Sequence, residues 1–377
     1  MKFVIAPDKF KGSLSGQQFC EAVEIGLQRV FPQADIIKIP LADGGDGTLD
    51  VVKSFLKAKE VRVKVHDPLF RKRSATYLFS PEHKMAYIEM AEASGHALLT
   101  NEELNCMQTT SLGTGELLSD AMAKGAKKIF LGIGGSATND GGMGMATAIG
   151  YAFLDAENNK LIPIGGNLTK VRKILKPKND PTARIDFSVI CDVENPFYGE
   201  NGAAKIYAKQ KGASDTDIVS LDEGLQNFAA VIETEFGIDV QPIKGSGAAG
   251  GMGGGALVFL NGKLRKGIDA VKDIANFDQA IQGADWIITG EGNLDSQTLS
   301  GKTISGVVDS ARREGIPVAA FCGNVGLSSS EIKAIGINYA ISVSKGMPNL
   351  KTAMANAHTN VSLTAFEFAK SLKNANL

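Results

Sequence analysis

Apolar and polar residues alternate along the first 56 residues in a way that predicts strands and helices in turn. An apolar run at 2–6 predicts a strand, and after Ser15 the apolar residues recur at helical spacing. Ser15 and Gln18 fit a capping box at the start of that helix. A second strand at 35–39 and a second helix at 48–56 follow. This order indicates an α/β domain.

The pattern changes between residues 60 and 90. Valines alternate with charged residues at 61–66, and further strands are predicted at 74–79 and 85–90 with no long helix among them. Such a run favours an antiparallel portion and a domain crossing near residues 66–85. After residue 285 strands and helices alternate again. The length of 377 residues also suggests two domains.

Composition and charge narrow the class of protein. Apolar residues make up 44% and charged residues 21%, which is typical of globular domains. The 40 basic and 41 acidic residues give a net charge of −1, so nothing in the charge favours nucleic acid or an anionic membrane as a partner. No apolar stretch approaches the roughly 20 residues that cross a bilayer, and the first apolar run is too short for a signal peptide.

The four cysteines lie far apart without a Cys-x-x-Cys pair, which favours free buried thiols over a zinc site or disulfides. A reducing compartment follows from that interpretation. We therefore expect a cytoplasmic protein.

Several predicted strands end in loops rich in Gly, Asp, Asn, Ser and Thr, and in open α/β sheets ligands bind outside the carboxyl ends of strands. The strongest signal is the loop 134–142, which follows a strand at 128–133. Its glycines let backbone N–H groups approach an anion, and the next helix start adds partial positive charge. Asn139 and Asp140 could bind a phosphate-linked Mg²⁺, or Asp140 could cap the helix. The alternative is a tight turn without a ligand.

Two other segments resemble phosphate-binding loops less closely. Residues 245–255 contain seven glycines, which could surround a nucleotide, allow close helix packing or form a hinge. Neither Gly-rich segment fits the dinucleotide fingerprint. Gly301-Lys302-Thr303 resembles the end of a P-loop, but Ser296 stands where that motif needs glycine. Lys302 could still neutralise a phosphate, or it could be a solvated lysine.

Acidic residues recur in the same loops. They are Asp8, Asp43, Asp46, Asp140, Asp192, Glu291 and Asp295. Some of them could be helix caps, yet phosphoryl transfer to an alcohol needs carboxylates to orient the hydroxyl and to hold Mg²⁺. Lys9 and Lys11 could bind a substrate carboxylate or a phosphate, or they could be solvated surface charges.

Taken together, these loops resemble those of the bacterial glycerate kinase family of the two-domain type. The matching stretches occur in the order typical of that family, from near the start to near the end of the chain. They are APDKFKGSLS (6–15), PLADGGDGT (40–48), GIGGSATNDGGMGM (132–145), CDVENPFYGENGAA (191–204), QKGAS (210–214), GSGAAGGMGGG (245–255) and GEGNLDSQTLSGKT (290–303).

The resemblance implies a fold and an activity. It implies a flavodoxin-like α/β domain from residues 1–75 and 285–377, an inserted mixed-sheet α/β domain at 76–284, and an active site in the cleft between them. It also implies that ATP and Mg²⁺ are used to phosphorylate D-glycerate, most often at the 2-hydroxyl to give 2-phosphoglycerate. The oligomeric state stays open, a homodimer being one option.

Residue chemistry at the matching positions suggests roles. Lys9 and Lys11 would meet the charge of the substrate or of a phosphate, and Asp295 would orient the substrate hydroxyl. Asp43, Asp46 and Asp192 are candidates for the catalytic base, with Asp43 and Asp192 also candidates for binding the metal. The residues assigned to the phosphates are Gly134, Gly135, Ser136, Ala137, Thr138, Asn139, Asp140 and Lys302.

Three other interpretations stay open at this point. Phosphorylation could fall on the 3-hydroxyl, which lies on the adjacent carbon. The protein could be a non-catalytic nucleotide or anion sensor, although several acidic loop residues argue against that. It could also be an aspartyl-phosphate enzyme with Asp8 as the nucleophile.

Overall fold

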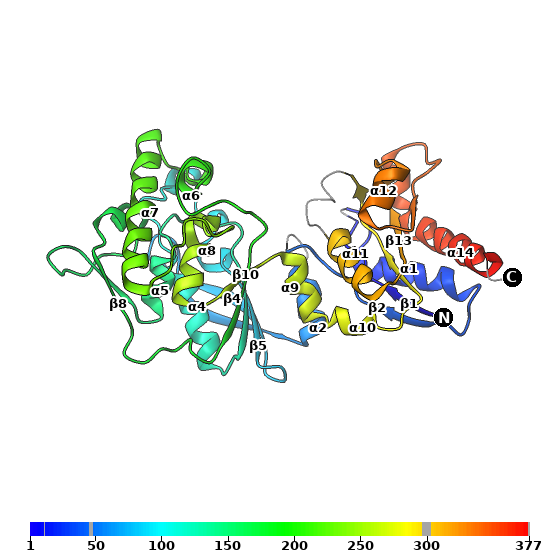
Figure 1. Ribbon diagram of the computed structural model, residues 1–377, viewed down its shortest axis with the longest axis horizontal. Coiled ribbons are helices and arrows are strands. Elements are labelled where there is room, and N and C mark those ends of the chain that lie inside the picture. The colour runs from blue at the N-terminus through cyan, green and yellow to red at the C-terminus, as the bar shows by residue number, and fades with distance from the viewer. Residues whose placement is uncertain (11, 45–47, 296–302, 376–377) are drawn as a thin grey trace. The chain divides into compact units, whose positions relative to one another are not determined.

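The computed structural model describes residues 1–10, 12–44, 48–295 and 303–375. The chain divides into two compact units, Met1–Phe55 with Lys266–Leu377, and Leu56–Arg265 (Figure 1). We call them the discontinuous unit and the insert. The boundaries at 75/76 and 284/285 expected from the sequence lie later in the chain. The first boundary is earlier because β3 (Lys59–His66) pairs with β4 (Lys72–Ser80) and so belongs to the insert. The second is earlier because Ile268 of α9 (Gly267–Ile274) packs on Gly306, so α9 belongs to the discontinuous unit.

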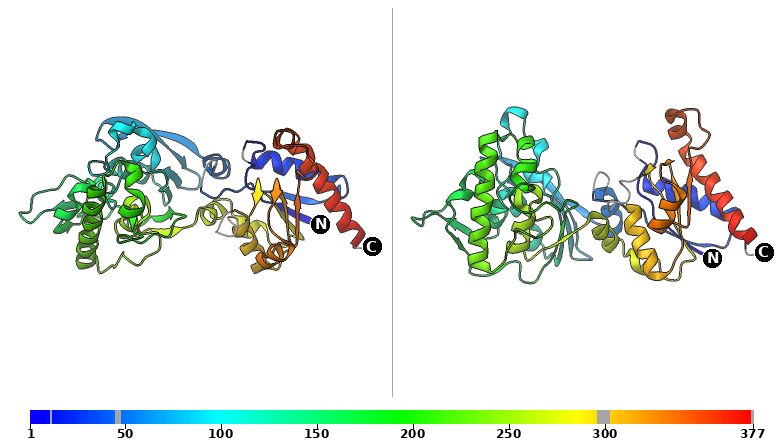
Figure 2. Two further views of the ribbon diagram at one scale, coloured as in Figure 1. Left: turned by 90° about the horizontal axis from the view of Figure 1, so that it is seen from above. Right: turned by 45° about the horizontal axis from the view of Figure 1, so that its top comes forward.

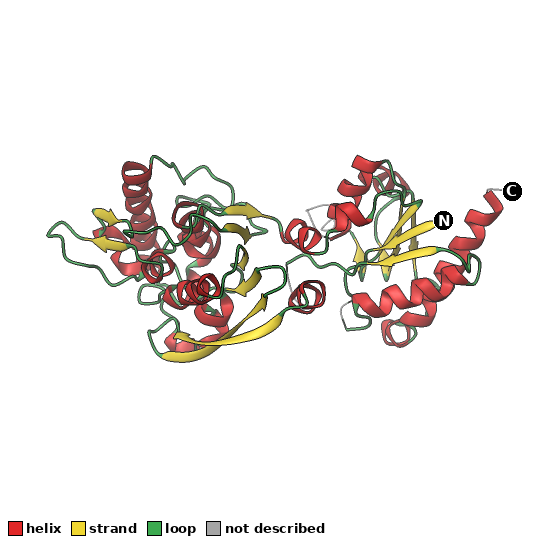
Figure 3. Ribbon diagram, turned by 90° about the horizontal axis from the view of Figure 1, so that it is seen from below, coloured by secondary structure: helices red, strands yellow, loops and turns green. Residues whose placement is uncertain are grey.

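The discontinuous unit contains one sheet of five parallel strands in the order β15-β13-β11-β1-β2. Numbered within this unit and read from the other edge, the order is 2-1-3-4-5, which is the flavodoxin-like arrangement. The strands are β1 (Lys2–Ile5), β2 (Asp35–Lys38), β11 (Trp286–Thr289), β13 (Val318–Cys322) and β15 (Tyr339–Ser342). Figure 3 shows this sheet between layers of helices. The expected fold class is therefore confirmed.

Helices cover both faces of that sheet. On one face α1 (Gly16–Gln28) and α14 (Ala357–Ala375) lie side by side (Figure 2) and share a core with the sheet. They approach closely at Gly26, where an added Cβ would lie 2.3 Å from the Ser362 carbonyl oxygen. On the other face α9 and α11 (Thr303–Glu314) contribute to a second core. This three-layer packing explains why both chain ends are needed to build one unit.

Local signals place several elements of this unit. Ser15 Oγ accepts from the Gln18 N–H (3.1 Å), and Gln18 Oε1 accepts from the Ser15 N–H (2.9 Å), so the expected capping box is present. Helix α2 (Thr48–Leu56) has the predicted bounds. The sequence pattern did not predict the short elements α10 (Phe277–Ala280), β12 (Asn293–Leu294), β14 (Asn324–Val325), α12 (Ser329–Ile335) and α13 (Leu350–Ala355).

The insert contains a mixed sheet of six strands in the order β10-β9-β6-β5-β4-β3. The first four are parallel, and β4 and β3 run antiparallel beyond β5. The remaining bounds are β5 (Met85–Glu89), β6 (Lys128–Gly132), β9 (Asp186–Ile190) and β10 (Lys263–Arg265). The antiparallel portion predicted from the valine alternation at 61–66 is therefore confirmed.

The helices of the insert pack around a core that contains Phe153, Phe228 and Phe259. They are α3 (Ala91–Ser94), α4 (Leu112–Ala123), α5 (Met143–Ala148), α6 (Ala203–Tyr207), α7 (Asp215–Phe236) and α8 (Ala248–Phe259). A two-stranded pair, β7 (Ala152–Leu154) with β8 (Lys173–Leu175), lies apart from the main sheet. Helix α8 is unusual in composition, because five of its twelve residues are glycine, which disfavours a helix.

Two expectations about the whole chain can be checked directly. All four cysteines are free, and Cys20, Cys106 and Cys322 are buried while Cys191 is partly exposed. Among the described residues, no helix has the length and apolar character needed to span a membrane.

Candidate active site

The carboxyl edge of the five-stranded sheet brings two of the predicted loops together. In the flavodoxin-like order the strand connections change direction between β1 and β11, and ligands bind at such switch points. The two loops are joined there, because the Asp8 N–H donates to the Gly290 carbonyl (2.9 Å) and Thr289 Oγ1 donates to the Ala6 carbonyl (2.8 Å). The start of the stretch at 6–15 and the start of the stretch at 290–303 thus meet in one place.

Asp8 is held firmly within this edge. Its carboxylate accepts from Thr303 Oγ1 (2.6 Å), at the start of α11, and from the Lys9 N–H (2.7 Å). Burial raises the pKa of Asp8 and the charge of Asp43 adds to that effect, while the Thr303 hydrogen bond opposes it. Asp8 and Lys9 also line a cavity of about 650 Å³ between the start of α1 and α2. These two residues therefore have the surroundings of a binding site.

The other predicted residues of this unit are only partly placed. Asp43 lies beside the start of α9, since a Cβ added at Gly267 would be 2.1 Å from the Asp43 carbonyl oxygen. The carboxylate of Asp295 accepts from the Asn293 side chain. Lys11, Asp46 and Lys302 lie outside the residues that the structure describes.

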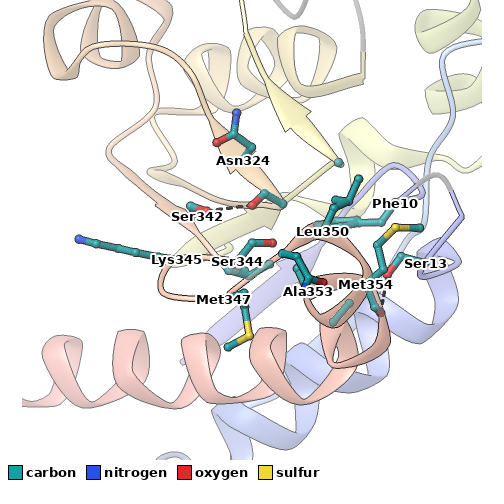
Figure 4. A pocket seen from close by; sticks show the side chains of 15 residues that line it. Phe10, Ser13, Asn324, Ser342, Ser344, Lys345, Met347, Leu350, Ala353 and Met354 are labelled. Carbon is teal, nitrogen blue, oxygen red and sulfur yellow. Dashed lines mark hydrogen bonds between the residues drawn. The ribbon is translucent and has the colours of Figure 1, made fainter.

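A second cavity of about 720 Å³ lies at the same edge of the sheet, beyond β13 and β15. Figure 4 shows Phe10, Met347, Leu350 and Met354 around it, with Ser344 among the polar side chains. Its volume is that of a site for a drug-sized ligand, and its lining is largely apolar. Such a cavity suits an aromatic base better than a three-carbon acid.

In the insert, the loop after β6 begins with an exposed anion-binding geometry. Gly134 and Gly135 are exposed, and Gly135 has a left-handed backbone with φ of +69°. Within the described part of the chain, the N–H groups of Gly134, Gly135 and Ser136 donate to no other residue. Successive backbone N–H groups around a left-handed residue form a concavity that binds anions. The first three residues of the predicted loop therefore present N–H donors of the kind that anion-binding loops use.

The rest of that loop is buried, and hydrogen bonds of Asp140 fix its conformation. The Asp140 carboxylate accepts from the Ser111 N–H (2.8 Å) and Oγ (2.7 Å) and from the N–H groups of Gly142 (3.2 Å) and Gly144 (3.1 Å). Burial raises the pKa of Asp140, and these hydrogen bonds counteract the rise. Of the two roles open to Asp140, the contacts favour the capping of α5 over contact with a ligand.

The second Gly-rich segment packs against the first. The Gly141 N–H donates to the Gly250 carbonyl (3.0 Å), and Ala249, Gly250 and Gly251 at the start of α8 all have left-handed backbones. A Cβ on Gly250 would lie 2.1 Å from the Thr138 carbonyl oxygen. Its glycines thus allow close packing, which is one of the three roles expected for them.

This packing gives a matched test. Gly250 and Gly237 both have φ of +70°, but a Cβ on Gly237 would meet nothing within 4 Å. We expect Gly237→Ala to destabilise by about 1 kcal/mol through backbone strain alone. Gly250→Ala should cost about 3 kcal/mol because overpacking adds to the strain. Urea unfolding of both variants checks the difference, and equal losses would contradict the close packing at Thr138.

Two carboxylates flank the loop at the ends of neighbouring strands. Glu89 ends β5 opposite Gly132 of β6, and Asp192 follows β9 and is exposed. The buried Tyr87 hydroxyl donates to Glu89 Oε1 (2.8 Å), and the charge of Asp192 also acts on that hydroxyl. Burial raises the pKa of Glu89. The sequence pattern did not single out Glu89, although its place at the end of a predicted strand is the signal that could have found it.

The described residues offer few carboxylates for a metal ion at this site. Among the described residues, no group of three or more His, Cys, Asp or Glu side chains is arranged to hold a metal ion. Mg²⁺ is usually held by one or two carboxylates with water and substrate phosphates. Glu89 and Asp192 are two such carboxylates, at the ends of the two strands that pair with β6.

Comparison with known proteins decides the family. A model described as the glycerate kinase family matches residues 3–373. The chain belongs to the glycerate kinase family. It is 44% identical over 352 residues to the glycerate kinase of Halalkalibacterium halodurans, with 93% of each chain covered. Members of the glycerate kinase family transfer a phosphoryl group, so the chain is a phosphotransferase.

Two further relatives agree with this family over nearly the whole length. The chain is 39% identical to the glycerate 2-kinase of Escherichia coli K12, with 99% of this chain and 98% of the relative covered. A crystal structure from Salmonella typhimurium LT2, assigned as glycerate kinase 2, matches with a TM-score of 0.86 and 38% identity. That match covers 100% of this chain and 99% of the other. The α/β fold described above is therefore also the fold of this solved relative.

Proposed function

We propose that this enzyme transfers the γ-phosphoryl group of ATP to the 2-hydroxyl of D-glycerate, giving 2-phosphoglycerate and ADP. Membership of the glycerate kinase family supports the substrate class. The name of the Escherichia coli relative, glycerate 2-kinase, supports the 2-hydroxyl. Because ATP is the phosphoryl donor, we place the reaction in the cytoplasm.

The observation that carries this proposal is the grouping at the ends of β5, β6 and β9. The N–H groups of Gly134, Gly135 and Ser136 offer hydrogen bonds to phosphate oxygens, and two carboxylates lie at the ends of the neighbouring strands. Phosphoryl transfer is accelerated mainly by positioning and by neutralising charge on the phosphate oxygens. We propose that this grouping supplies hydrogen-bond donors to the phosphates and carboxylates to the substrate hydroxyl and the metal.

The proposed step assigns these groups as follows. The glycerate hydroxyl oxygen bonds to the γ-phosphorus, the bond from that phosphorus to the bridging β,γ-oxygen breaks, and the hydroxyl proton passes to a carboxylate. Asp192 is the proposed base because it is exposed at the end of β9. Glu89 would hold Mg²⁺, and Mg²⁺ would neutralise phosphate charge. Asp43 stays a separate candidate ligand in the discontinuous unit. Lys9 would neutralise the charge of the substrate carboxylate or of a phosphate, and Asp295 would orient the substrate hydroxyl.

The 720 Å³ cavity is proposed as the site for the adenosine portion of ATP, because its size and apolar lining exceed what glycerate needs. Ala353, which is buried on α13 and lines it, gives the test. We expect Ala353→Phe to fill the cavity and to raise KM for ATP about tenfold or more, as desolvated apolar contacts are lost. KM for D-glycerate should stay the same. The opposite pattern would assign the cavity to glycerate.

The function is tested by measuring ADP release with Mg·ATP and D-glycerate, and by identifying the product with coupling enzymes. Direct consumption of the product by enolase is the expected result. A need for phosphoglycerate mutase before enolase would move the phosphate to the 3-hydroxyl. ADP binding without glycerate-dependent ADP release would support the sensor, and a trapped phosphoenzyme would support the aspartyl-phosphate alternative at Asp8.

A further inference from the structure

Lys211 lies buried against the Gly134–Asp140 loop, far from it in sequence. It ends a short 3-10 turn, Lys209–Lys211, and only 2% of it is exposed. Its Nζ donates to Ser136 Oγ (2.7 Å) and to the Thr138 carbonyl oxygen (2.8 Å). The side chain thus ties together two residues of the loop that begins with the anion-binding N–H groups.

This lysine lacks the partner that a buried charge usually has. Among the described residues, no carboxylate oxygen lies within 4.0 Å of its Nζ, whereas buried ammonium groups are normally paired. The titratable groups that act on it are Cys106 and Asp140, and the Asp140 carboxylate already accepts four hydrogen bonds. Burial lowers the pKa of Lys211 to about 8, so its charge is costly without an anion nearby.

Other polar groups of the loop also lack partners. Thr138 Oγ1 and the Nδ2 and Oδ1 atoms of Asn139 are buried and form no hydrogen bond with any described residue. Unsatisfied buried polar atoms cost stability unless something binds them. A cation and several unpaired polar groups therefore lie in the same loop as the exposed Gly134 and Gly135, which is the arrangement expected around a bound anion.

We propose that Lys211 is the charged support of the phosphate-binding loop. Its two hydrogen bonds hold Ser136 and Thr138 in place, and its ammonium charge strengthens phosphate binding at the N–H groups of Gly134, Gly135 and Ser136. This inference rests on the proposed function. Lys211 is a positioning residue, because its Nζ contacts the loop and the loop contacts the phosphate.

The position of Lys211 makes nucleotide binding depend on pH. A bound phosphate favours the charged ammonium, so binding raises the pKa of Lys211 and takes up a proton near pH 8. Above pH 8 the free enzyme loses the charge, and KM for ATP should rise with pH. Below pH 8 the charge is present and this dependence should vanish.

Kinetics of matched variants tests the role. Lys272 is also buried (7% exposed) and donates to a carbonyl, that of Gly306, and to a hydroxyl, that of Ser310, but it has Asp269 at 3.3 Å. Lys211→Met should raise KM for ATP about 10- to 100-fold, the range for a lost hydrogen bond to a charged group. Lys272→Met should lower the unfolding temperature and leave KM unchanged. Lys211→Arg should recover part of the loss.

Calorimetry of the unaltered enzyme provides a test that needs no variant. ADP is titrated at pH 8 in two buffers of different ionisation enthalpy, and a net uptake of protons should accompany ADP binding. Absence of proton uptake would overturn the role of Lys211 and leave the proposed function intact. The same holds if Lys211→Met is active and, like Lys272→Met, leaves KM for ATP unchanged. If the unaltered enzyme neither binds ADP nor turns over glycerate, the proposed function fails and the role of Lys211 fails with it.

Discussion

Replacing Asp192 by Asn is expected to lower kcat by about 10²- to 10⁴-fold, the contribution of a positioned general base. The amide keeps the shape of the side chain and cannot accept the hydroxyl proton. Asp192 is exposed at the end of β9, so the unfolding temperature should stay the same. Steady-state kinetics with saturating Mg·ATP and D-glycerate measures the effect.

The same strand provides the control. Asp186 is exposed at the other end of β9, where Lys263 lies 3.6 Å from its carboxylate. Asp186→Asn should leave both kcat and the unfolding temperature nearly unchanged, because an exposed ion pair contributes little. Near-normal turnover of Asp192→Asn would remove Asp192 from the proposed mechanism and leave Glu89 as the next base to test.

Replacing Asp140 by Ala is expected to destabilise the protein by roughly 4 kcal/mol, as breaking a buried charged network does. The change leaves the buried N–H groups of Ser111, Gly142 and Gly144 without their acceptor. The loop that presents the phosphate-binding N–H groups should lose its shape, so KM for ATP should rise as well. Urea unfolding and ATP kinetics measure the two effects.

A similar aspartate in a solvated loop serves as the comparison. Asp155 accepts from the N–H groups of Glu157 (3.0 Å) and Asn159 (2.8 Å), but it is partly exposed. Water can replace its carboxylate, so Asp155→Ala should cost only about 1 kcal/mol. If both variants lost a similar free energy of unfolding, burial of the Asp140 carboxylate would not explain the stability that its hydrogen bonds contribute.

Much of the fold could be predicted because local signals and tertiary structure agree. The predicted helix at 48–56 has the bounds found in the structure, and the Ser15–Gln18 capping box is present. The bounds of helix α8 could not be predicted, because seven glycines within eleven residues disfavour a helix. Packing against the loop at 134–142 overrides that propensity, since only residues without a side chain fit there.

The candidate site was harder to predict than the fold. The glycines that expose N–H groups could be found, because glycine after a strand is itself a signal. Lys211 lies in the matching stretch QKGAS, but its burial and contacts could not be predicted, because lysine is usually exposed and its partners Thr138 and Ser136 lie 73 and 75 positions away. The burial of Asp140 is likewise set by Ser111, which is distant in sequence and close only after folding.

The discontinuous unit has a consequence for the order of events during synthesis. Strand β1 lies between β2 and β11, and Thr289 bonds to Ala6 across 283 positions. The β1–β2 pair is therefore without its third strand until the ribosome has made all of Leu56–Arg265. Two strands alone are marginally stable, whereas the insert is continuous and emerges complete. We expect the insert to fold first on the ribosome, while the N-terminal segment waits as a nascent, chaperone-accessible chain.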